Sequence, residues 1–309
     1  MTFSAKDVAD LRLKTGAGMM ECKNALTEAK GNIEKAGEIL RQKGLVAAAK
    51  KSEKTTLEGI VISKISGDKK NGAILELNTQ TDFVAKNEKF IELASIMLDA
   101  ILSNKPVSAE QVLLLKANGT LMSELVSSRI ATLGENIQLR RFELFGLGNE
   151  GGIISTYIHP VGNKIGVLIK LVTSPDITTC IVELEELAKN IAMHIAASQP
   201  QPEYINSTTI PKDVIENERR IELGKEDLVK KTKEIAEKIV QGRLDKILAQ
   251  RCLMSQPYIK DPNITIEKLI KEKSKQLNTD IKVSHFVRYN VGEVLEKDTS
   301  KEKAAVSIT

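Results

Sequence analysis

The sequence has little of several residue types on which common functions depend. It contains no tryptophan, only 3% of its residues are aromatic, and it has three histidines and three cysteines. The cysteines, Cys22, Cys180 and Cys252, lie far apart along the chain. An odd number of scattered cysteines argues against a disulfide framework or a zinc site. We therefore expect three buried thiols in a reducing compartment.

Long apolar runs and a strong net charge are also missing. No apolar run approaches the roughly 18 residues that a membrane span requires, and residues 1–7 lack the basic start and apolar core of a signal peptide. These absences predict a cytoplasmic protein without a membrane partner. The net charge is +4, from 45 basic and 41 acidic side chains. Such a small excess gives no general electrostatic reason to expect nucleic-acid binding.

The residues that common enzymes use are poorly represented. There is no phosphate-binding loop, and the glycine cluster at residues 15–18 follows a predicted helix instead of a strand. His194 lies in an apolar helical pattern that is typical of a satisfied core histidine, whereas His159, before Pro160 in a predicted turn, is expected to be the more exposed of the three. None of the three histidines has metal-ligand spacing to Cys, Asp or Glu. We expect no catalytic residue, metal or cofactor, so an enzyme is the least favoured interpretation.

The first 54 residues have the pattern of three short helices and a linker. Ser4 and Asp7 have the spacing of a capping box, the glycines at residues 16 and 18 end the first helix, and Gly44 is expected to close the third. The alanine- and lysine-rich residues 45–54 predict a solvated helical connector, with a basic contact to RNA as the alternative. The 309 residues of the chain leave room for two or three domains.

A repeated pattern follows this helical region. Residues 59–65 and 72–77 alternate or run apolar as a β-hairpin does, and residues 152–158 and 166–171 repeat the same glycine and apolar positions. We therefore expect an α+β protein in which two related subdomains, each with a small antiparallel sheet, follow the helical bundle. The predicted boundaries are 1–54 for the bundle, 55–145 for the first subdomain and 146–295 for the second.

An insertion and a tail complete the second subdomain. Residues of about 212–252 predict an antiparallel helical hairpin that protrudes from it, with an apolar seam between its arms. The predicted seam consists of Ile235, Ile239, Leu244, Ile247 and Leu248. Residues 296–309 are charged and low in bulky side chains, which predicts a frayed tail.

The most informative stretch is the junction after the first predicted hairpin. Thr81 or Asp82 can cap a helix there, and Phe83 is an unusual residue in a chain so poor in aromatics. One interpretation is local packing, in which Phe83 fills the core beneath the junction. The other is that Phe83 projects toward a partner. In the second repeat the corresponding residues are Asp176 and Ile177, so only the first copy has the aromatic residue.

Two ungapped strings identify a resemblance. Residues 81–87 read Thr-Asp-Phe-Val-Ala-Lys-Asn, and residues 15–23 read Thr-Gly-Ala-Gly-Met-Met-Glu-Cys-Lys. Both resemble the elongation factor Ts family, the nucleotide exchange factors of the GTPase elongation factor Tu. Further similarity occurs at residues 134–137, 191–194 and 288–293. The resemblance implies a translation factor that binds elongation factor Tu loaded with GDP and promotes GDP release by disturbing the Mg²⁺ and nucleotide site.

The resemblance also implies site residues. The contact that displaces Mg²⁺ from the partner GTPase would be formed by Thr81, Asp82, Phe83 and Val84. The first 54 residues would form a bundle similar to ubiquitin-associated domains. Further contacts to the partner would involve Met19, Met20, Lys23, Leu133, Gly134 and His159. From the residues alone, both methionines can equally be packing residues, and Gly134 can simply end a helix.

Two alternatives and several questions stay open at this point. A ribosome- or RNA-associated protein would use the basic pairs at residues 50–51 and 140–141, and its affinity for RNA would fall steeply with salt. A scaffold with an adaptor module would bind through residues 1–50 alone. The favoured interpretation predicts no direct nucleic-acid contact. The stoichiometry with the partner and homodimerisation through the second subdomain are left undetermined by the sequence.

Overall fold

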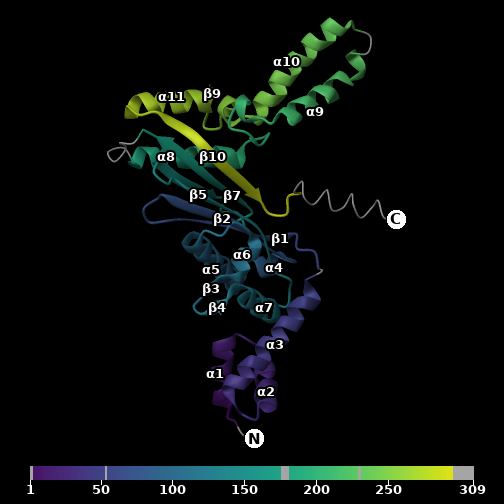
Figure 1. Cartoon of the computed structure of the whole chain (residues 1–309), viewed down its shortest axis with the longest axis vertical. Helices are drawn as coiled ribbons and strands as arrows, with labels where there is room; N and C mark the ends of the chain where they lie inside the picture. The colour runs from purple at the N-terminus through teal and green to yellow at the C-terminus, as the bar shows by residue number, and fades with distance from the viewer. Residues whose placement is uncertain (1–2, 53, 175–180, 229–230, 295–309) are drawn as a thin grey trace.

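The computed structural model describes residues 3–52, 54–174, 181–228 and 231–294. Along the long axis, a helical module at the N-terminal end is followed by a body that contains two sheets, and a pair of long helices projects at the far end (Figure 1). The predicted α+β class with an N-terminal helical bundle is confirmed. The second-copy junction residues 175–177, Cys180 and the predicted frayed tail at 296–309 lie outside the described residues.

The N-terminal module consists of three helices, α1 (Ala5–Thr15), α2 (Met19–Glu28) and α3 (Ile33–Lys51). Ser4 forms the predicted capping box, since its backbone N–H donates to Asp7 Oδ2 at 2.7 Å and its hydroxyl accepts from the Asp7 N–H at 3.3 Å. The small core of the module includes Leu11, Leu26 and the buried thiol of Cys22.

The prediction that Gly44 closes the third helix is wrong. Helix α3 continues through Gly44 to Lys51 because its second half packs along α7 (Met122–Leu133). A Cβ atom at Gly44 would lie 3.8 Å from Ala131 Cβ, an ordinary contact distance, so α3 and α7 are in contact at this point. Residues 45–51 are helical, as the prediction of a helical connector for residues 45–54 required, and they continue α3 as far as the body.

The first subdomain combines a three-stranded antiparallel sheet with helices on one face. Its sheet has the order β1-β2-β5, with β1 (Glu58–Ile65), β2 (Asn71–Thr79) and β5 (Gln138–Gly146). Helix α5 (Glu88–Asn104) and α7 cover the sheet, and their apolar faces form its core around the fully buried Phe90. The smaller elements are α4 (Asp82–Ala85), α6 (Ala109–Leu114), β3 (Lys116–Ala117) and β4 (Thr120–Leu121).

The second subdomain repeats this arrangement, as the sequence pattern predicts. Its antiparallel sheet has the order β10-β7-β6, with β6 (Gly151–Ile158), β7 (Ile165–Thr173) and β10 (Ile281–Asn290). Helices α8 (Ile181–Ala197) and α11 (Ile266–Leu277) cover it and enclose a separate core.

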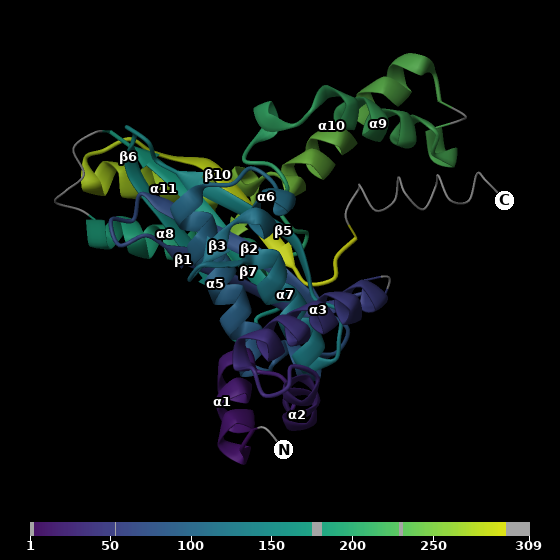
Figure 2. The same ribbon diagram turned by 60° about the horizontal axis from the view of Figure 1, so that its bottom comes forward.

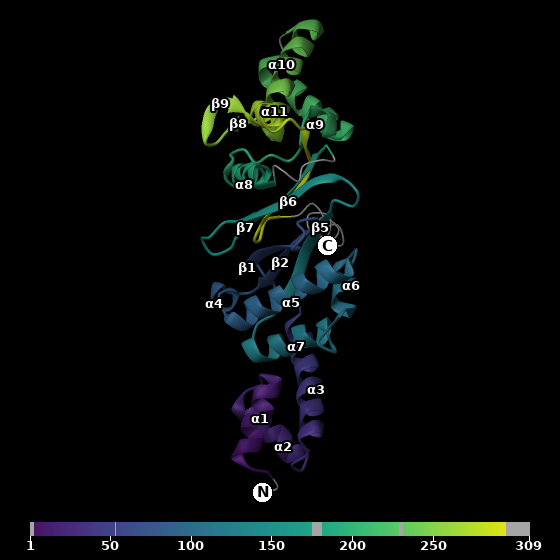
Figure 3. The ribbon, with the colours of Figure 1, turned by 90° about the vertical axis from the view of Figure 1, so that its left-hand side faces the viewer.

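The two sheets pack face to face, which the sequence did not predict. Figure 3 shows the resulting order of helices, sheet, sheet and helices along the molecule. The layer between the sheets contains the side chains of Val61, Ile74, Ile154 and Leu168. Gly72 and Gly166 make the close approach possible, because added Cβ atoms there would lie 2.6 Å from Ile154 Cγ2 and 2.5 Å from Val61 Cγ1.

The helical hairpin lies in the chain between α8 and α11. Helices α9 (Lys212–Leu223) and α10 (Lys233–Arg251) pack side by side and project from the second subdomain (Figures 1 and 2). The predicted seam is partly confirmed, because Leu244 is buried and Ile239 packs beside it. Ala236 and Val240 complete the seam, whereas Ile235, which was predicted to belong to it, is 51% exposed. The remaining elements are β8 (Pro257–Tyr258), β9 (Asp261–Thr265) and the 3₁₀ turns Ser207–Thr209, Glu226–Leu228 and Leu253–Ser255. Among the described residues, no helix is long and apolar enough to cross a membrane.

Candidate functional site

The site begins where β2 ends and residues 81–84, here called the tip, start the short helix α4. Phe83 in the first turn of α4 is 82% exposed, whereas Phe90, seven residues later, is fully buried. Leaving a phenylalanine in water forgoes about 1.5–3 kcal/mol of burial free energy. The interpretation of Phe83 as a core plug is therefore wrong. Val84 and Ala85 pack on the subdomain core instead, and Phe83 projects from it.

Asp82 is the charged member of the tip. Its Oδ2 accepts a hydrogen bond of 2.7 Å from Lys86 Nζ, one turn later on the same surface. This hydrogen bond lowers the pKa of Asp82, so its carboxylate is ionised at neutral pH. The side chain remains 47% exposed. The tip therefore presents an aromatic ring and an anion side by side.

Thr81 anchors the tip to the body. Its hydroxyl oxygen caps α4 by accepting the Val84 N–H at 3.4 Å. The same hydroxyl donates to Glu135 Oε1 at 2.7 Å, and the Thr81 backbone N–H donates to Glu135 Oε2 at 3.0 Å. Glu135 Oε2 also accepts from the Gln80 N–H at 3.1 Å and from the Thr79 hydroxyl at 2.8 Å. One carboxylate thus holds three consecutive residues at the base of the tip.

Sequence reasoning did not assign a role to Glu135. Burial works against its ionisation, but the hydrogen bonds from Thr81, Thr79 and two backbone N–H groups outweigh that effect and lower its pKa. The only local signal is that a carboxylate follows the glycine that stops a helix. The residues it binds are more than 50 positions away in the sequence, so no local pattern could identify them.

Leu133 and Gly134, both predicted partner contacts, have local structural roles. Leu133 is half-buried against the first core, and Gly134 ends α7 with φ = 81°. The Gly134 carbonyl accepts a hydrogen bond from Lys51 Nζ. Asn136 Nδ2 donates to the carbonyl oxygens of Ser52 and Lys54 at 3.3 and 2.9 Å. The segment that carries Glu135 is thereby fixed on both sides.

The turn between β6 and β7 lies beside the tip. The Val61 N–H donates to the Asn163 carbonyl at 2.7 Å, and Lys164 Nζ pairs with Glu58 at the start of β1. The positive charge of Lys164 also contributes to the lowered pKa of Asp82. In Figure 3, α4 and this turn lie at the same edge of the molecule. The structure thus brings the predicted residue His159 to the end of the body that carries the tip.

His159 is half-buried, with Nδ1 at 3.2 Å from the Tyr157 hydroxyl. The expectation that it is the most exposed histidine is wrong. His285 is more exposed because the β10 register shifts between Val283 and His285. In the turn itself, residues 160–162 are exposed, and Val161 among them is a large hydrophobic side chain that is 73% exposed. An exposed valine between proline and glycine was not singled out by sequence reasoning.

The predicted contacts of the N-terminal module lie at the start of α2. Met19 and Met20 are 47% and 63% exposed, and Lys23 is exposed as well. The two methionines are therefore not core residues. The Thr132 hydroxyl of α7 donates to the Gly16 carbonyl at 3.3 Å, so the loop before α2 touches the helix that leads to Glu135. A cleft of about 630 Å³, lined by residues of both, lies between the module and α7 beside the place where α3 packs on α7.

Arg140 and Arg141 do not form an exposed basic patch. Both pair with Glu76, which is fully buried, at 3.4 and 2.7 Å. Arg141 also pairs with Glu293 at 2.6 Å and lies over the Tyr289 ring, 4.0 Å from its centroid. These arginines join the first sheet to the end of β10, which removes half of the basic residues on which the RNA-binding alternative depends.

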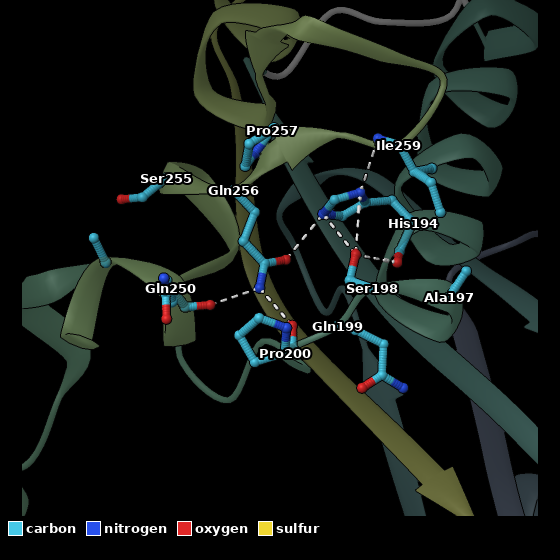
Figure 4. A pocket seen from close by; sticks show the side chains of 11 residues that line it. His194, Ala197, Ser198, Gln199, Pro200, Gln250, Ser255, Gln256, Pro257 and Ile259 are labelled. Carbon is cyan, nitrogen blue, oxygen red and sulfur yellow. Dashed lines mark hydrogen bonds between the residues drawn. The ribbon is translucent and has the colours of Figure 1, made fainter. Parts of the chain in front are cut away.

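A separate cavity of about 420 Å³ lies at the base of the helical hairpin (Figure 4). His194 lines it and is buried. Its Nδ1 accepts the Ile259 N–H at 3.2 Å, so the proton is on Nε2, 3.0 Å from Gln256 Oε1. Gln256 in turn donates to the carbonyl oxygens of Pro200 and Gln250 at 2.9 and 2.7 Å. Burial lowers the pKa of His194. Its burial and these hydrogen bonds confirm the predicted satisfied core histidine, and they link α8 to the base of the hairpin.

Within the described residues, no three His, Cys, Asp or Glu side chains come together as a metal site requires. The buried cysteines of the described part, Cys22 and Cys252, are free thiols, as expected.

Comparisons with known proteins give a consistent result. A family model described as Elongation factor TS matches residues 80–293. The chain is 42% identical over 300 residues to the Elongation factor Ts of Nostoc sp. PCC 7120, which covers 96% of this chain and 95% of the relative. It is 41% identical over 309 residues to that of Syntrophotalea carbinolica, with 99% of both chains covered. With the Clostridium botulinum type A protein of the same name the identity is 43% over 298 residues, covering 96% and 94%.

Proposed function

The chain belongs to the elongation factor Ts family and is a translation elongation factor, and from this premise we propose that it releases GDP from the GTPase elongation factor Tu. The observation that carries the proposal is Phe83, an 82% exposed aromatic side chain on a helix turn that Glu135 holds in place. A rigid, exposed aromatic residue is the kind of side chain that dominates binding energy at protein interfaces.

The proposed mechanism needs no catalytic group. GDP is held on a GTPase partly through Mg²⁺, which demands near-ideal octahedral coordination at roughly 2.0–2.1 Å. Phe83 entering between elements of the partner displaces them, and a displacement of about 1 Å is enough to degrade this coordination. The Asp82 carboxylate perturbs the polar contacts near the ion. The phosphates then lose their counter-charge and the nucleotide leaves, so the protein is an exchange factor and not an enzyme that makes or breaks bonds.

The energetics require an extended contact surface. Binding of the exchange factor and of GDP are coupled reciprocally, so each tenfold weakening of GDP requires about 1.4 kcal/mol of preferential binding to the nucleotide-free partner. We propose that Met19, Met20 and Lys23 supply a second contact and that the turn carrying His159 supplies a third. This turn, Leu133 and Gly134 lie close to the tip or support it.

We further propose the domain division 1–54, 55–145 and 146–295, with the helical hairpin at about 212–252 as an arm of the last domain. Homodimerisation through the second subdomain stays a prediction, which sedimentation of the purified protein tests directly.

The test is release of a fluorescent GDP analogue from the cognate elongation factor Tu. The wild-type protein is expected to accelerate release strongly, and the Asp82→Ala/Phe83→Ala variant to lose at least tenfold of that acceleration, equivalent to about 1.4 kcal/mol. Val107→Ala is the matched control, because Val107 is 83% exposed in the same subdomain but lies after α5, away from the tip. No acceleration by the wild-type protein would refute the proposed function. Acceleration that the double variant retains would move the site away from the tip.

A further inference from the structure

Glu135 contacts the base of the tip but is itself no part of the exposed surface formed by Asp82 and Phe83. Its two carboxylate oxygens accept four hydrogen bonds of 2.7 to 3.1 Å, two from hydroxyl groups and two from backbone N–H groups. All four donors belong to residues 79–81. A carboxylate is suited to this place because both of its oxygens accept hydrogen bonds when it is ionised, whereas a side-chain amide has one oxygen that accepts and one NH₂ group that donates.

The carboxylate also determines the direction of the cap hydrogen bond. A hydroxyl group has one proton to donate and two lone pairs. Because Thr81 donates its proton to Glu135 Oε1 at 2.7 Å, its lone pairs face the Val84 N–H, which it accepts at 3.4 Å. Glu135 therefore fixes both the backbone that leads into α4 and the cap that starts it. The orientation of the first turn of α4, where Phe83 lies, follows from these contacts.

The second repeat shows the same connection without a carboxylate. Helix α11 ends at Asn278 with a positive φ of 49°, as α7 ends at Gly134, and Thr279 takes the place that Glu135 has in the first repeat. Among the described residues, the Thr279 hydroxyl lies 2.5 Å from the hydroxyl of Ser174, just after β7, and the Asp280 N–H donates to the same Ser174 hydroxyl at 3.3 Å. In the described part of the second repeat, hydroxyl and backbone groups make this connection, whereas in the first repeat a carboxylate makes it.

We propose that Glu135 is a positioning residue for nucleotide exchange, which holds residues 79–81 so that the tip presents Asp82 and Phe83 to the partner in one fixed orientation. This inference rests on the proposed function. Glu135 touches neither the partner nor the nucleotide in this account. It acts by preorganisation, because a tip that is already ordered loses less conformational entropy when it binds.

The test compares Glu135→Ala and Glu135→Gln in the full-length protein. The Ala variant removes all four acceptor contacts. The Gln variant keeps one acceptor oxygen, which can retain the contacts of Oε2, but its amide group cannot accept the Thr81 hydroxyl proton. Glu92→Gln is the matched control, because Glu92 is a carboxylate of the same subdomain that pairs with Arg129 on the helical side. GDP release is measured at limiting and saturating concentrations, and amide hydrogen exchange is measured on the free protein.

We expect Glu135→Ala to lower the acceleration of GDP release about tenfold and Glu135→Gln about threefold, with Glu92→Gln unchanged. Amide exchange should increase in residues 79–86 and stay unchanged in α5. In a Phe83→Ala background, the loss caused by Glu135→Gln should shrink to less than half, because the positioned side chain is already absent. If the Ala variant does not fold, the Gln variant alone is used for GDP release, for amide exchange and for the comparison in the Phe83→Ala background.

The inference is overturned if both variants accelerate GDP release as the control does. It is also overturned if amide exchange rises throughout the subdomain, or if the loss is as large in the Phe83→Ala background, since either result means general destabilisation. The wild-type protein in the same assay separates this inference from the proposed function. If the wild type does not accelerate GDP release, the proposed function itself is refuted, whatever the Glu135 variants do.

Discussion

The two subdomains are built from elements of nearly the same length, yet the tip belongs to the first. β1 and β6 have 8 residues, β2 and β7 have 9, α5 and α8 have 17, and α7 and α11 have 12. The first subdomain has a clamped, exposed tip after its second strand, whereas residues 175–177 at the matching point of the second lie outside the described residues. The second adds the long helical hairpin before α11. The duplicated scaffold thus supplies two stable layers, and each copy has its own addition at a different point.

The two subdomains also differ in the charged residue that each buries in its central strand. Glu76 of β2 and Lys170 of β7 occupy equivalent positions 94 residues apart, both buried but of opposite charge. Glu76 is fully buried between two arginines, whereas Lys170 pairs at 2.5 Å with Glu150, whose side chain is 55% exposed. The burial of the partner, and not the charge itself, decides how much each residue matters for stability.

The largest effect is therefore expected for Glu76→Gln. Removing one partner of a buried ion pair leaves the other uncompensated, which costs about 3 kcal/mol or more. Lys170→Met, the equivalent change in the second repeat, leaves the half-exposed Glu150 carboxylate and the Gly146 carbonyl, which Lys170 Nζ reaches at 3.0 Å. Water can reach both exposed residues, so the cost should stay within about 1 kcal/mol. Urea unfolding of both variants measures the difference. Equal losses would show that burial of the partner does not distinguish the two repeats.

Gly59 and Gly152 are expected to be equivalent, in contrast to the charges. Their φ angles are 152° and 141°, and an added Cβ would lie 2.2 Å from the Leu77 carbonyl oxygen in one case and 2.1 Å from that of Leu171 in the other. Since backbone must move to admit a methyl group, each change to alanine should lower the free energy of unfolding by about 2–3 kcal/mol. Gly67→Ala, with open space around it, is the control. Clearly unequal losses at the two positions would contradict a true structural repeat.

The two repeats should also lose stability in different pH ranges. Burial lowers the pKa of His194 from its ordinary 6.5, so the unfolded chain takes up a proton there before the folded protein does. Its contribution is complete above pH 6.5 and falls as the pH decreases toward the folded pKa. The pKa of Glu135 is lowered from 4.5, so its contribution is lost only below that pH.

Urea unfolding between pH 7.5 and 3.5 tests this order. We expect a loss of at most about 1.4 kcal/mol per pH unit from one group, first in the second repeat and then in the first. His194→Gln should remove the component that starts near pH 6.5, and Glu135→Gln the one below pH 4.5. A wild-type stability that is unchanged between pH 7 and 5.5 would contradict the role assigned to His194.

The repeat itself could be predicted from the sequence because its signals are local. Glycines and alternating apolar residues recur at the same spacing, and helix ends such as Gly134 are visible in a few residues. Errors occurred where a distant segment decides the outcome. Gly44 continues its helix because α7 packs beside it, and Arg140 and Arg141 are buried because Glu76 on the neighbouring strand pairs with them.

The candidate site likewise has residues that a local sequence pattern could indicate and residues that depend on distant segments. Asp82 and Phe83 were predicted from the family resemblance, whereas their strand-to-helix context by itself favoured local packing of Phe83 over projection. Glu135 was missed because its hydrogen-bond partners are 54 to 56 residues away. The face-to-face packing of the sheets was missed for the same reason, since Gly72 and Gly166 reveal a close approach only when the opposite sheet is in place.

The smallest effect on stability is expected at the residue with the largest proposed effect on function. Phe83→Ala removes a side chain that is 82% exposed, so the free energy of unfolding should change by less than about 0.5 kcal/mol. Phe90→Ala, seven residues away and fully buried, should cost about 3–5 kcal/mol. Only the first variant should lose the acceleration of GDP release while it unfolds at the same urea concentration as the wild type. A substantial loss of stability in Phe83→Ala would mean that the ring packs on the body in solution. The first subdomain would then differ from the second in packing and not in what it presents to a partner.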